Sequence, residues 1–112
     1  LNTIDQQGNK EFKVKSIFIK TNGIGRYINI KDIIMIKADS NYSYLYLLNG
    51  ERFLTSKTLK YWQEKCADPF LQRIHKSYLI NTAFIVSIEP KTGKVNLVNG
   101  HLACSSRSRK LK

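Results

Sequence analysis

Residues 70–81 hold the side chains best suited to chemistry, in the order Phe-Leu-Gln-Arg-Ile-His-Lys-Ser-Tyr-Leu-Ile-Asn. Apolar and polar residues alternate here with a period of two, which is typical of a strand with one face on a core and one in water. Lys76 falls on the apolar side of this pattern. Because an ammonium group is costly to bury without a partner, we expect the chain to bend or leave the sheet there. A cation between the imidazole of His75 and the hydroxyl of Ser77 suits an anionic partner, although an ordinary amphipathic strand would show the same alternation.

No combination of residues predicts catalysis. Asp39, His75 and one of several serines would form a triad only if the fold brought them together, and the strand–elbow–helix serine motif is absent. Paired carboxylates are scarce among the eight acidic residues, and the segment Gly23-Ile24-Gly25 lacks the third glycine of a dinucleotide motif. We therefore expect a domain that is not an enzyme and that uses no cofactor.

The cysteines and histidines do not form a recognisable metal motif. Cys66, Cys104, His75 and His101 lack the close Cys-x-x-Cys or His-x-x-x-His spacing of a zinc site, so no metal is expected. Two cysteines are too few for a disulfide framework, and no secretion signal is recognisable, which favours reduced thiols in a cytoplasm. Cys104 is expected to be a small core residue, and a redox role for it stays open.

Positive charge is the strongest global property of the chain. Nineteen Lys and Arg residues against eight Asp and Glu give a formal net charge of +11 in 112 residues, with a pI of about 9.8. This balance in a small domain favours a polyanionic partner, nucleic acid first and an anionic membrane surface second. The basic residues are spread along the chain, which favours a charged face on a folded domain over a basic tail. The hydrophobic fraction of 42% is that of a globular domain.

Most of the chain is expected to form short strands of an antiparallel meander. Residues 1–13 have little periodicity and are expected to be a linker or disordered extension, which leaves residues 14–112 as the folded domain. β-Branched and aromatic residues mark the strands, and Asn-Gly or Thr-Gly pairs mark the turns. The expected strands cover residues 14–21, 27–38 with a corner at 31–32, 42–48, 51–55, 84–90, 94–98 and 101–105.

One short helix is expected near residues 57–67. Thr55 or Ser56 would cap its start by accepting a hydrogen bond from a free backbone amide, and Pro69 would end it. Trp62 lies on an apolar stripe at helical spacing, so it is expected to anchor the helix on the sheet rather than to stack on a base. The stripe consists of Leu59, Trp62 and Cys66.

Several short motifs occur in a characteristic order. The most specific is Arg73-x-His75-x-Ser77-Tyr78-Leu79-x-Asn81, which follows the expected helix and precedes an Asn-Gly hairpin. The others are Ile33-x-x-Ile36-x-Ala38-x-x-Asn41-Tyr42, Asn49-Gly50, Ser56-x-x-Leu59, Ile85-x-x-Ile88, Val95-x-Leu97-x-Asn99-Gly100 and Ser105-x-Arg107. Together they cover about residues 14–112, and they resemble the LytTR DNA-binding domain, the output module of many bacterial two-component response regulators.

This resemblance implies both an architecture and a partner. The implied fold is an elongated stack of small antiparallel β-sheets with one short helix. The implied function is sequence-specific binding of double-stranded DNA by loops at one edge, which enter successive major grooves without a recognition helix. An upstream receiver domain, tandem direct repeats in the DNA and a dimer on the DNA are also implied, whereas a membrane partner is not.

Carried over to this chain, the resemblance implies DNA contacts around Asn41, beside Lys76 and at the C-terminal arginines. Lys76 or Arg107 would donate to O6 and N7 of guanine, and Asn41 would pair with an adenine edge. Lys57, Ser77 and Arg109 suit phosphates, which position a protein without reading sequence. The complete set of expected DNA-binding residues is Asn41, Tyr42, Ser43, Lys57, His75, Lys76, Ser77, Arg107 and Arg109.

Two parts of this assignment stay open. His75 is expected more as structural support than as a base contact, and Tyr78 is expected to pack inward. Many family members end in Pro-Val-Ser-Arg-Arg where this chain has Ala-Cys-Ser-Ser-Arg at residues 103–107, so the register of the last contacts is undetermined.

Two other classes of binding protein compete with this prediction. Tyr42, Tyr44, Tyr46 and Phe53 on neighbouring strands, with lysines nearby, would suit base stacking in a single-strand or RNA-binding β module. The third hypothesis is a protein-interaction domain whose charge only aids solubility. Its binding would be insensitive to salt, whereas phosphate contacts release counterions and weaken steeply as salt rises.

Overall fold

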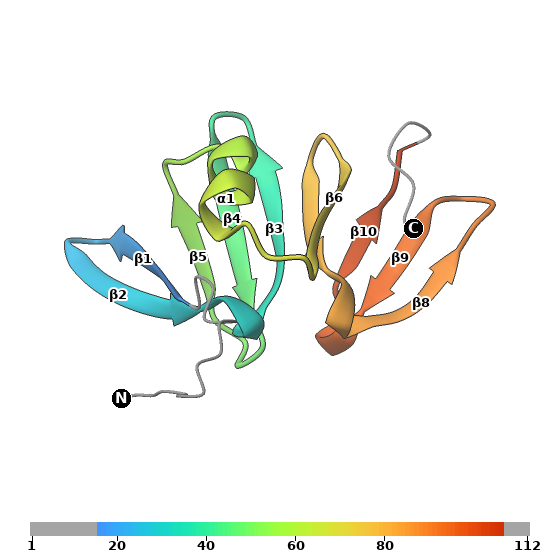
Figure 1. Cartoon of the computed structure of the whole chain (residues 1–112), viewed down its shortest axis with the longest axis horizontal. Helices are drawn as coiled ribbons and strands as arrows, with labels where there is room; N and C mark the ends of the chain where they lie inside the picture. The colour runs from blue at the N-terminus through green and yellow to red at the C-terminus, as the bar shows by residue number, and fades with distance from the viewer. Residues whose placement is uncertain (1–15, 107–112) are drawn as a thin grey trace, which may run out of the picture.

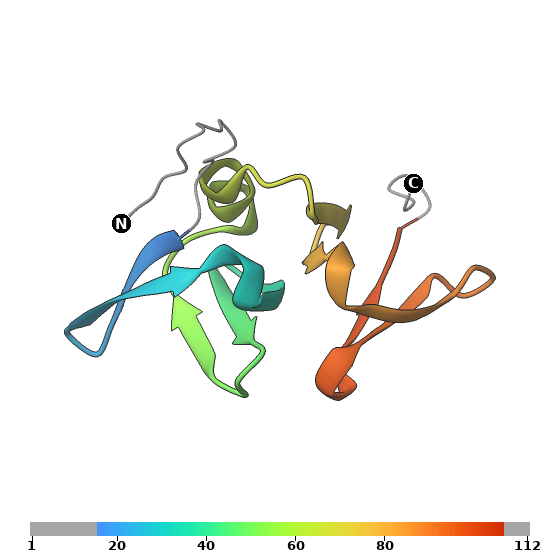
Figure 2. The same ribbon diagram turned by 60° about the horizontal axis from the view of Figure 1, so that its bottom comes forward.

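Three small antiparallel sheets lie side by side in the computed structural model, which describes residues 16–106 (Figure 1). Ten strands, one α-helix and three 3-10 turns make up the described part, and the molecule is elongated, at 45 × 36 × 24 Å. Figure 2 shows the two outer sheets at opposite ends, with the central sheet and the helix between them. The predicted fold class is confirmed, and the expected linker at residues 1–13 lies outside the described residues.

The central sheet has five strands in the order β5-β4-β3-β7-β6. All four residues at the start of β3, residues 33–36, are buried, because this strand is covered on both faces. The predicted hairpin around Asn49-Gly50 is confirmed as β4 and β5, and Gly50 has the positive φ of 97° that such a turn requires. The strands are β3 (Ile33–Asp39), β4 (Tyr42–Leu47), β5 (Arg52–Thr55), β6 (Leu71–His75) and β7 (Tyr78–Asn81).

Each outer sheet covers one face of the central sheet. The two-stranded one, called the β1–β2 ribbon below, buries Ile17 and Ile19 and exposes Phe18 and Lys20, as their alternation predicts. The 3-10 turn Ile30–Asp32 is the corner that the sequence predicts between β2 and β3. The outer strands are β1 (Ser16–Thr21) and β2 (Ile24–Asn29) on one side, and β8 (Ile85–Glu89), β9 (Lys94–Leu97) and β10 (Leu102–Cys104) on the other.

The helix α1 spans Leu59–Cys66, a shorter segment than expected. Its cap is Thr58, whose hydroxyl accepts from the amide of Tyr61 at 3.2 Å, so the prediction of Thr55 or Ser56 as the cap is wrong. Thr55 instead ends β5, and its hydroxyl accepts from the indole nitrogen of Trp62 at 3.0 Å. This bond and the buried apolar stripe confirm Trp62 as the anchor of the helix.

Two hydrophobic cores lie on opposite faces of the central sheet. The first joins one face to the β1–β2 ribbon and α1, and the second joins the other face to the β8–β10 sheet. Burial of Cys66 in the first core raises the pKa of its thiol to about 11. Cys104 is exposed, against the prediction of a core residue, because Ala103 takes the inward position of β10 and Cys104 pairs with Lys94 on the outer face.

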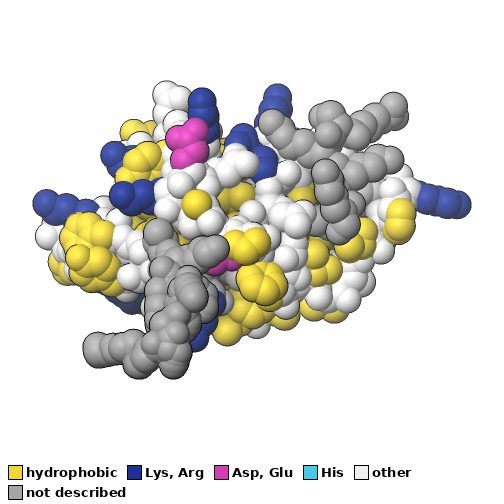
Figure 3. All heavy atoms as spheres, viewed as in Figure 1, with side chains coloured by type: hydrophobic (Ala, Val, Ile, Leu, Met, Phe, Trp, Pro, Cys, Tyr) yellow, Lys and Arg dark blue, Asp and Glu magenta, His cyan; other side chains and the backbone are white. Residues whose placement is uncertain are grey.

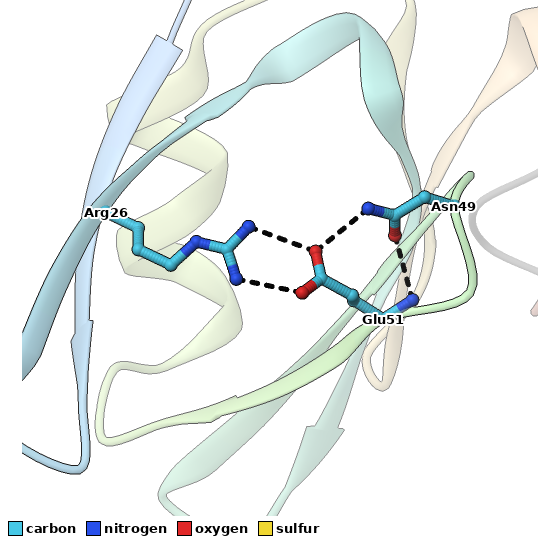
Figure 4. Close-up of polar contacts among 3 residues, drawn as sticks. All are labelled: Arg26, Asn49 and Glu51. Carbon is cyan, nitrogen blue, oxygen red and sulfur yellow. Dashed lines mark hydrogen bonds and ion pairs between the residues drawn. The ribbon is translucent and has the colours of Figure 1, made fainter.

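A bidentate ion pair ties the β1–β2 ribbon to the central sheet (Figure 4). The guanidinium of Arg26 donates to both carboxylate oxygens of Glu51, at 2.9 and 3.0 Å. Asn49 donates its side-chain amide to the same carboxylate and accepts from the Glu51 backbone amide. These hydrogen bonds lower the pKa of Glu51 to about 2, the bond from Arg26 contributing most.

Acid should therefore weaken the domain through Glu51. A carboxyl whose pKa is lower in the folded than in the unfolded state stabilises the fold above its usual pKa of roughly 4.3, and that stabilisation is lost as the pH falls toward 2. We expect Glu51→Gln to show a smaller loss of stability than the wild type between pH 5 and 2.5, measured by urea unfolding. Glu64→Gln, at an exposed glutamate of α1 without an ion pair in residues 16–106, is the matched control. An unchanged pH dependence in Glu51→Gln would contradict the prediction.

Candidate nucleic-acid interface

Four segments that are distant in sequence meet along one edge of the molecule, the upper edge in Figure 1. We call it the loop edge. The 3-10 turns and the β4–β5 turn lie along the opposite edge, which the same figure shows at the bottom. Figure 3 shows Lys and Arg side chains rising from the upper edge and lying at its left end. The loop edge consists of residues 40–41 between β3 and β4, 56–58 between β5 and α1, 76–77 between β6 and β7, and 105–106 after β10.

The β6–β7 turn presents Lys76 to solvent. The bend that the sequence predicts at Lys76 is a hairpin turn, so residues 70–81 form two strands rather than one interrupted strand. The backbone of the turn is tied to β3, because the amide of Ala38 donates to the carbonyl of Ser77 at 2.8 Å. The ammonium of Lys76 takes part in no ion pair within residues 16–106.

The side chain of Arg73 holds this turn in place. Its guanidinium donates to the backbone carbonyls of His75 at 2.9 Å and Lys76 at 2.8 Å. The third nitrogen donates to the side-chain carbonyl of Gln63 on α1 at 3.0 Å. The sequence motif includes Arg73 but predicts no role for it. Its place in that motif, two residues before His75, is the signal from which such a role could have been inferred. One arginine thus fixes the turn both to its own strand and to the helix.

His75 caps the same turn from inside. Its Nδ1 accepts a hydrogen bond from the backbone amide of Ser77 at 3.0 Å, and its ring centroid lies 5.7 Å from that of Tyr78. Both contacts support the interpretation of His75 as structural. Tyr78 packs against the second core, as expected.

The β3–β4 loop presents Asn41 and Tyr42. Ser40 turns the chain with a φ of 58°, which leaves Asn41 exposed at the tip. The Asn41 side-chain amide makes no hydrogen bond within residues 16–106, and the Tyr42 side chain is about half exposed, at 51%. Donors and acceptors of this amide are therefore available to a ligand.

Ser43 faces inward and is fully buried. Its hydroxyl lies 3.0 Å from the hydroxyl of Thr55 and donates to the backbone carbonyl of Lys57 at 2.8 Å. The predicted DNA contact of Ser43 is therefore not retained, because alternation along β4 turns this side chain into the first core. Ser43 instead fixes the backbone that carries Lys57, whose exposed ammonium lies 4.9 Å from the ring centroid of Tyr61.

The end of β10 is fixed at the loop edge from two sides. The amide of Ser105 donates to the carbonyl of Gly93 at 2.7 Å, and the amide of Ser106 donates to the carbonyl of Ile74 at 2.8 Å. Gly93 is needed at this contact, because a Cβ there would lie 2.8 Å from the carbonyl oxygen of Ser105. The predicted contacts at residues 107 and 109 lie outside the described residues, and the chain leaves the described part beside the β6–β7 hairpin.

The described part of the chain gives little support for a metal site or for a membrane-spanning helix. Residues 16–106 contain no group of three or more His, Cys, Asp or Glu side chains that would hold a metal ion. In the same range, no helix has the length and apolar character needed to cross a membrane. The chemistry that the loop edge offers is exposed hydrogen-bond donors and positive charge on a fixed backbone.

The buried hydroxyl of Ser43 should matter for stability. Ser43→Ala removes a donor and leaves the Lys57 carbonyl without this partner, so the free energy of unfolding should fall by about 1–3 kcal/mol in urea denaturation. Ser87→Ala removes an exposed hydroxyl on β8 and is the matched control, with an expected change within about 0.5 kcal/mol. Equal effects of the two substitutions would contradict the inward role of Ser43.

Comparison with known proteins identifies the family and the fold of this chain. A family model described as the LytTr DNA-binding domain matches residues 25–112. Among solved structures, the LytTr DNA-binding domain of a methyl-accepting/DNA response regulator from Bacillus cereus has the same fold, with a TM-score of 0.74 and 17% identity over 87% of this chain and 91% of that chain. No curated protein matches the sequence. Because the family model covers most of its length, this chain belongs to the LytTR DNA-binding domain family.

Proposed function

We propose that this domain binds double-stranded DNA sequence-specifically, as the output domain of a bacterial transcriptional response regulator. Its family is defined by DNA binding, and its formal net charge of +11 suits a polyanion. Lys76 and Asn41 support the proposal most directly. Both are exposed at the loop edge, and neither side chain has a polar partner in residues 16–106. The turn that carries Lys76 is also held by hydrogen bonds from the guanidinium of Arg73.

The loops at this edge would enter successive major grooves on one face of the duplex. Lys76 would donate to guanine O6 and N7, and Asn41 would pair with an adenine edge. The helix α1 does not suit a recognition role, because its apolar stripe lies in the first core. Elongation of the molecule along the direction of the loop edge supports contact with more than one groove.

Phosphate contacts would set the position of the domain on the duplex. Lys57 and the hydroxyl of Ser77 lie at the loop edge, near the turns that carry Asn41 and Lys76 (called the reading loops below). Both groups suit phosphate oxygens. Tyr42 lies next to Asn41 and would pack against the sugar–phosphate backbone. Arg107 and Arg109 follow the fixed segment 105–106 and would extend the interface at its C-terminal end.

The regulatory setting is part of the proposal. The domain would act in the cytoplasm, downstream of a receiver domain in the same protein, and would occupy tandem direct repeats as two copies. The Bacillus cereus domain of the same fold comes from a response regulator, which supports this setting.

A single-strand or RNA-binding module is the second candidate. In its favour, Tyr42 is exposed and the guanidinium of Arg52 lies 4.8 Å from the ring centroid of Tyr44. Against it, Phe53 is buried in the first core, and Tyr46 packs against the second core. Only two of the four aromatic residues would be available to stack on bases.

Selection from a pool of random duplex DNA at two salt concentrations tests the function. Enrichment of a short motif, repeated at about one helical turn, is expected if the loops read successive grooves. Binding that is tight at low salt but enriches no motif would contradict sequence-specific reading. A preference for single strands in competition would favour the second candidate.

The selected duplex then tests the reading residues. Lys76→Ala and Arg107→Ala should each weaken specific binding by about 1–3 kcal/mol and relax the preference at one position of the motif. Lys31→Ala is the matched control, because this exposed lysine lies on the 3-10 turn at the opposite edge. Unchanged affinity in both Lys76→Ala and Arg107→Ala, with unchanged circular dichroism, would refute the assignment of the site.

A further inference from the structure

A cleft lies between the β1–β2 ribbon and the connection from β5 to α1, at one end of the loop edge. Its volume is about 260 Å³. Neither the resemblance to the family nor the DNA contacts proposed above give this cleft a role. Lys20 of the ribbon and Lys57 of the connection from β5 to α1 both line it. The lining residues are Phe18, Ile19, Lys20, Thr55, Ser56, Lys57, Tyr61 and Trp62.

The charge of the cleft is uncompensated. Two of its lining residues are lysines and none is acidic. Neither Lys20 nor Lys57 takes part in an ion pair within residues 16–106, and both are exposed. Two ammonium groups of like charge around one hollow create a local positive potential, which favours an anion there.

The backbone segments that carry the two lysines are held in place on both sides of the cleft. The backbone of Lys57 is held by the buried hydroxyl of Ser43, which in turn lies beside the β3–β4 loop. The ribbon is held by its buried isoleucines and by the ion pair of Arg26 with Glu51. The hydroxyl of Thr55 already accepts from Trp62, which leaves the hydroxyls of Ser56 and Tyr61 available to a ligand.

The position of the cleft relative to the reading loops suggests its ligand. A duplex lying along the loop edge would pass over the β3–β4 loop and then over the connection from β5 to α1, and the ribbon projects beyond them (Figure 1). Its next contact on that side would be with the cleft. A lysine pair with a nearby hydroxyl suits a phosphodiester oxygen rather than a base edge.

We propose that this cleft binds a backbone phosphate of the DNA beyond the bases read by Asn41 and Lys76, with Lys20 as its principal ligand. The inference rests on the proposed function and deepens it. The ribbon thereby becomes part of the DNA interface, and the footprint of the domain is longer on the ribbon side than the reading loops alone require.

The test compares Lys20→Ala with the wild type on the duplex found by selection. Affinity of the full 112-residue chain is measured at several salt concentrations. The loss of one phosphate contact should weaken binding severalfold at low salt and reduce the slope of log K against log salt by about 0.9. Sequence preference should not change, because a phosphate contact reads no base. Lys20→Arg should restore affinity and slope, and Lys31→Ala should behave as the wild type.

Shortened duplexes locate the contact. The duplex is trimmed from one end and then from the other. Trimming on the ribbon side should weaken the wild type and make it equal to Lys20→Ala, whereas trimming on the other side should preserve the difference between them. A difference that survives both trims would mean that Lys20 acts only by long-range attraction, and would overturn the proposal.

The results distinguish this inference from the proposed function. If Lys20→Ala equals the wild type in affinity and slope while Lys76→Ala binds more weakly, the phosphate site is refuted and the DNA-binding function stands. If the wild type binds no duplex at all, the proposed function fails and the phosphate site fails with it. Circular dichroism of Lys20→Ala should match the wild type, because this side chain is exposed on the ribbon.

Discussion

Burial of the central sheet on both faces is the constraint on which the rest of this structure depends. The run of four buried residues at 33–36 in β3 requires apolar partners on each side. The β1–β2 ribbon and α1 cover one face, and the β8–β10 sheet covers the other. Because the strands are short and antiparallel, the turns between consecutive strands of the central sheet fall at one of two edges (Figure 1). The loop edge is thus a consequence of the layering rather than a separate element.

Polar side chains at the loop edge divide into two groups with different roles. Arg73, His75 and Ser43 satisfy backbone or hydroxyl groups within the domain, and an unsatisfied buried polar group would cost about 1–3 kcal/mol. Lys76 stands on the turn that Arg73 and His75 hold, and Asn41 lies two residues before Ser43; both side chains are exposed. A side chain on a fixed backbone loses less conformational freedom when it binds, which favours both affinity and selectivity. The inward group therefore determines how well the outward group can recognise a ligand.

Several lysines at the loop edge and at the cleft have no ion-pair partner among the described residues. Two ion pairs among the described residues involve basic side chains, and one of them, between Arg26 and Glu51, holds the ribbon in place. The lysines at 57 and 76 have no such partner, and neither has Lys20 at the cleft. The β1–β2 ribbon therefore has two roles: it completes the first core, and through Lys20 it extends the positive surface of the loop edge.

The sequence by itself determined the elements that depend on neighbouring residues. Asn-Gly pairs fixed the hairpin turns, the spacing of Trp62 fixed the buried face of the helix, and the break at Lys76 followed from the cost of burying an ammonium group. Tertiary structure alone decided that Ser43 points inward, that Cys104 points outward, and that Lys20 and Lys57 line one cleft. The reason is physical: period and turn chemistry are encoded within a few residues, whereas the face of a strand that becomes buried depends on elements packed against it from distant parts of the chain.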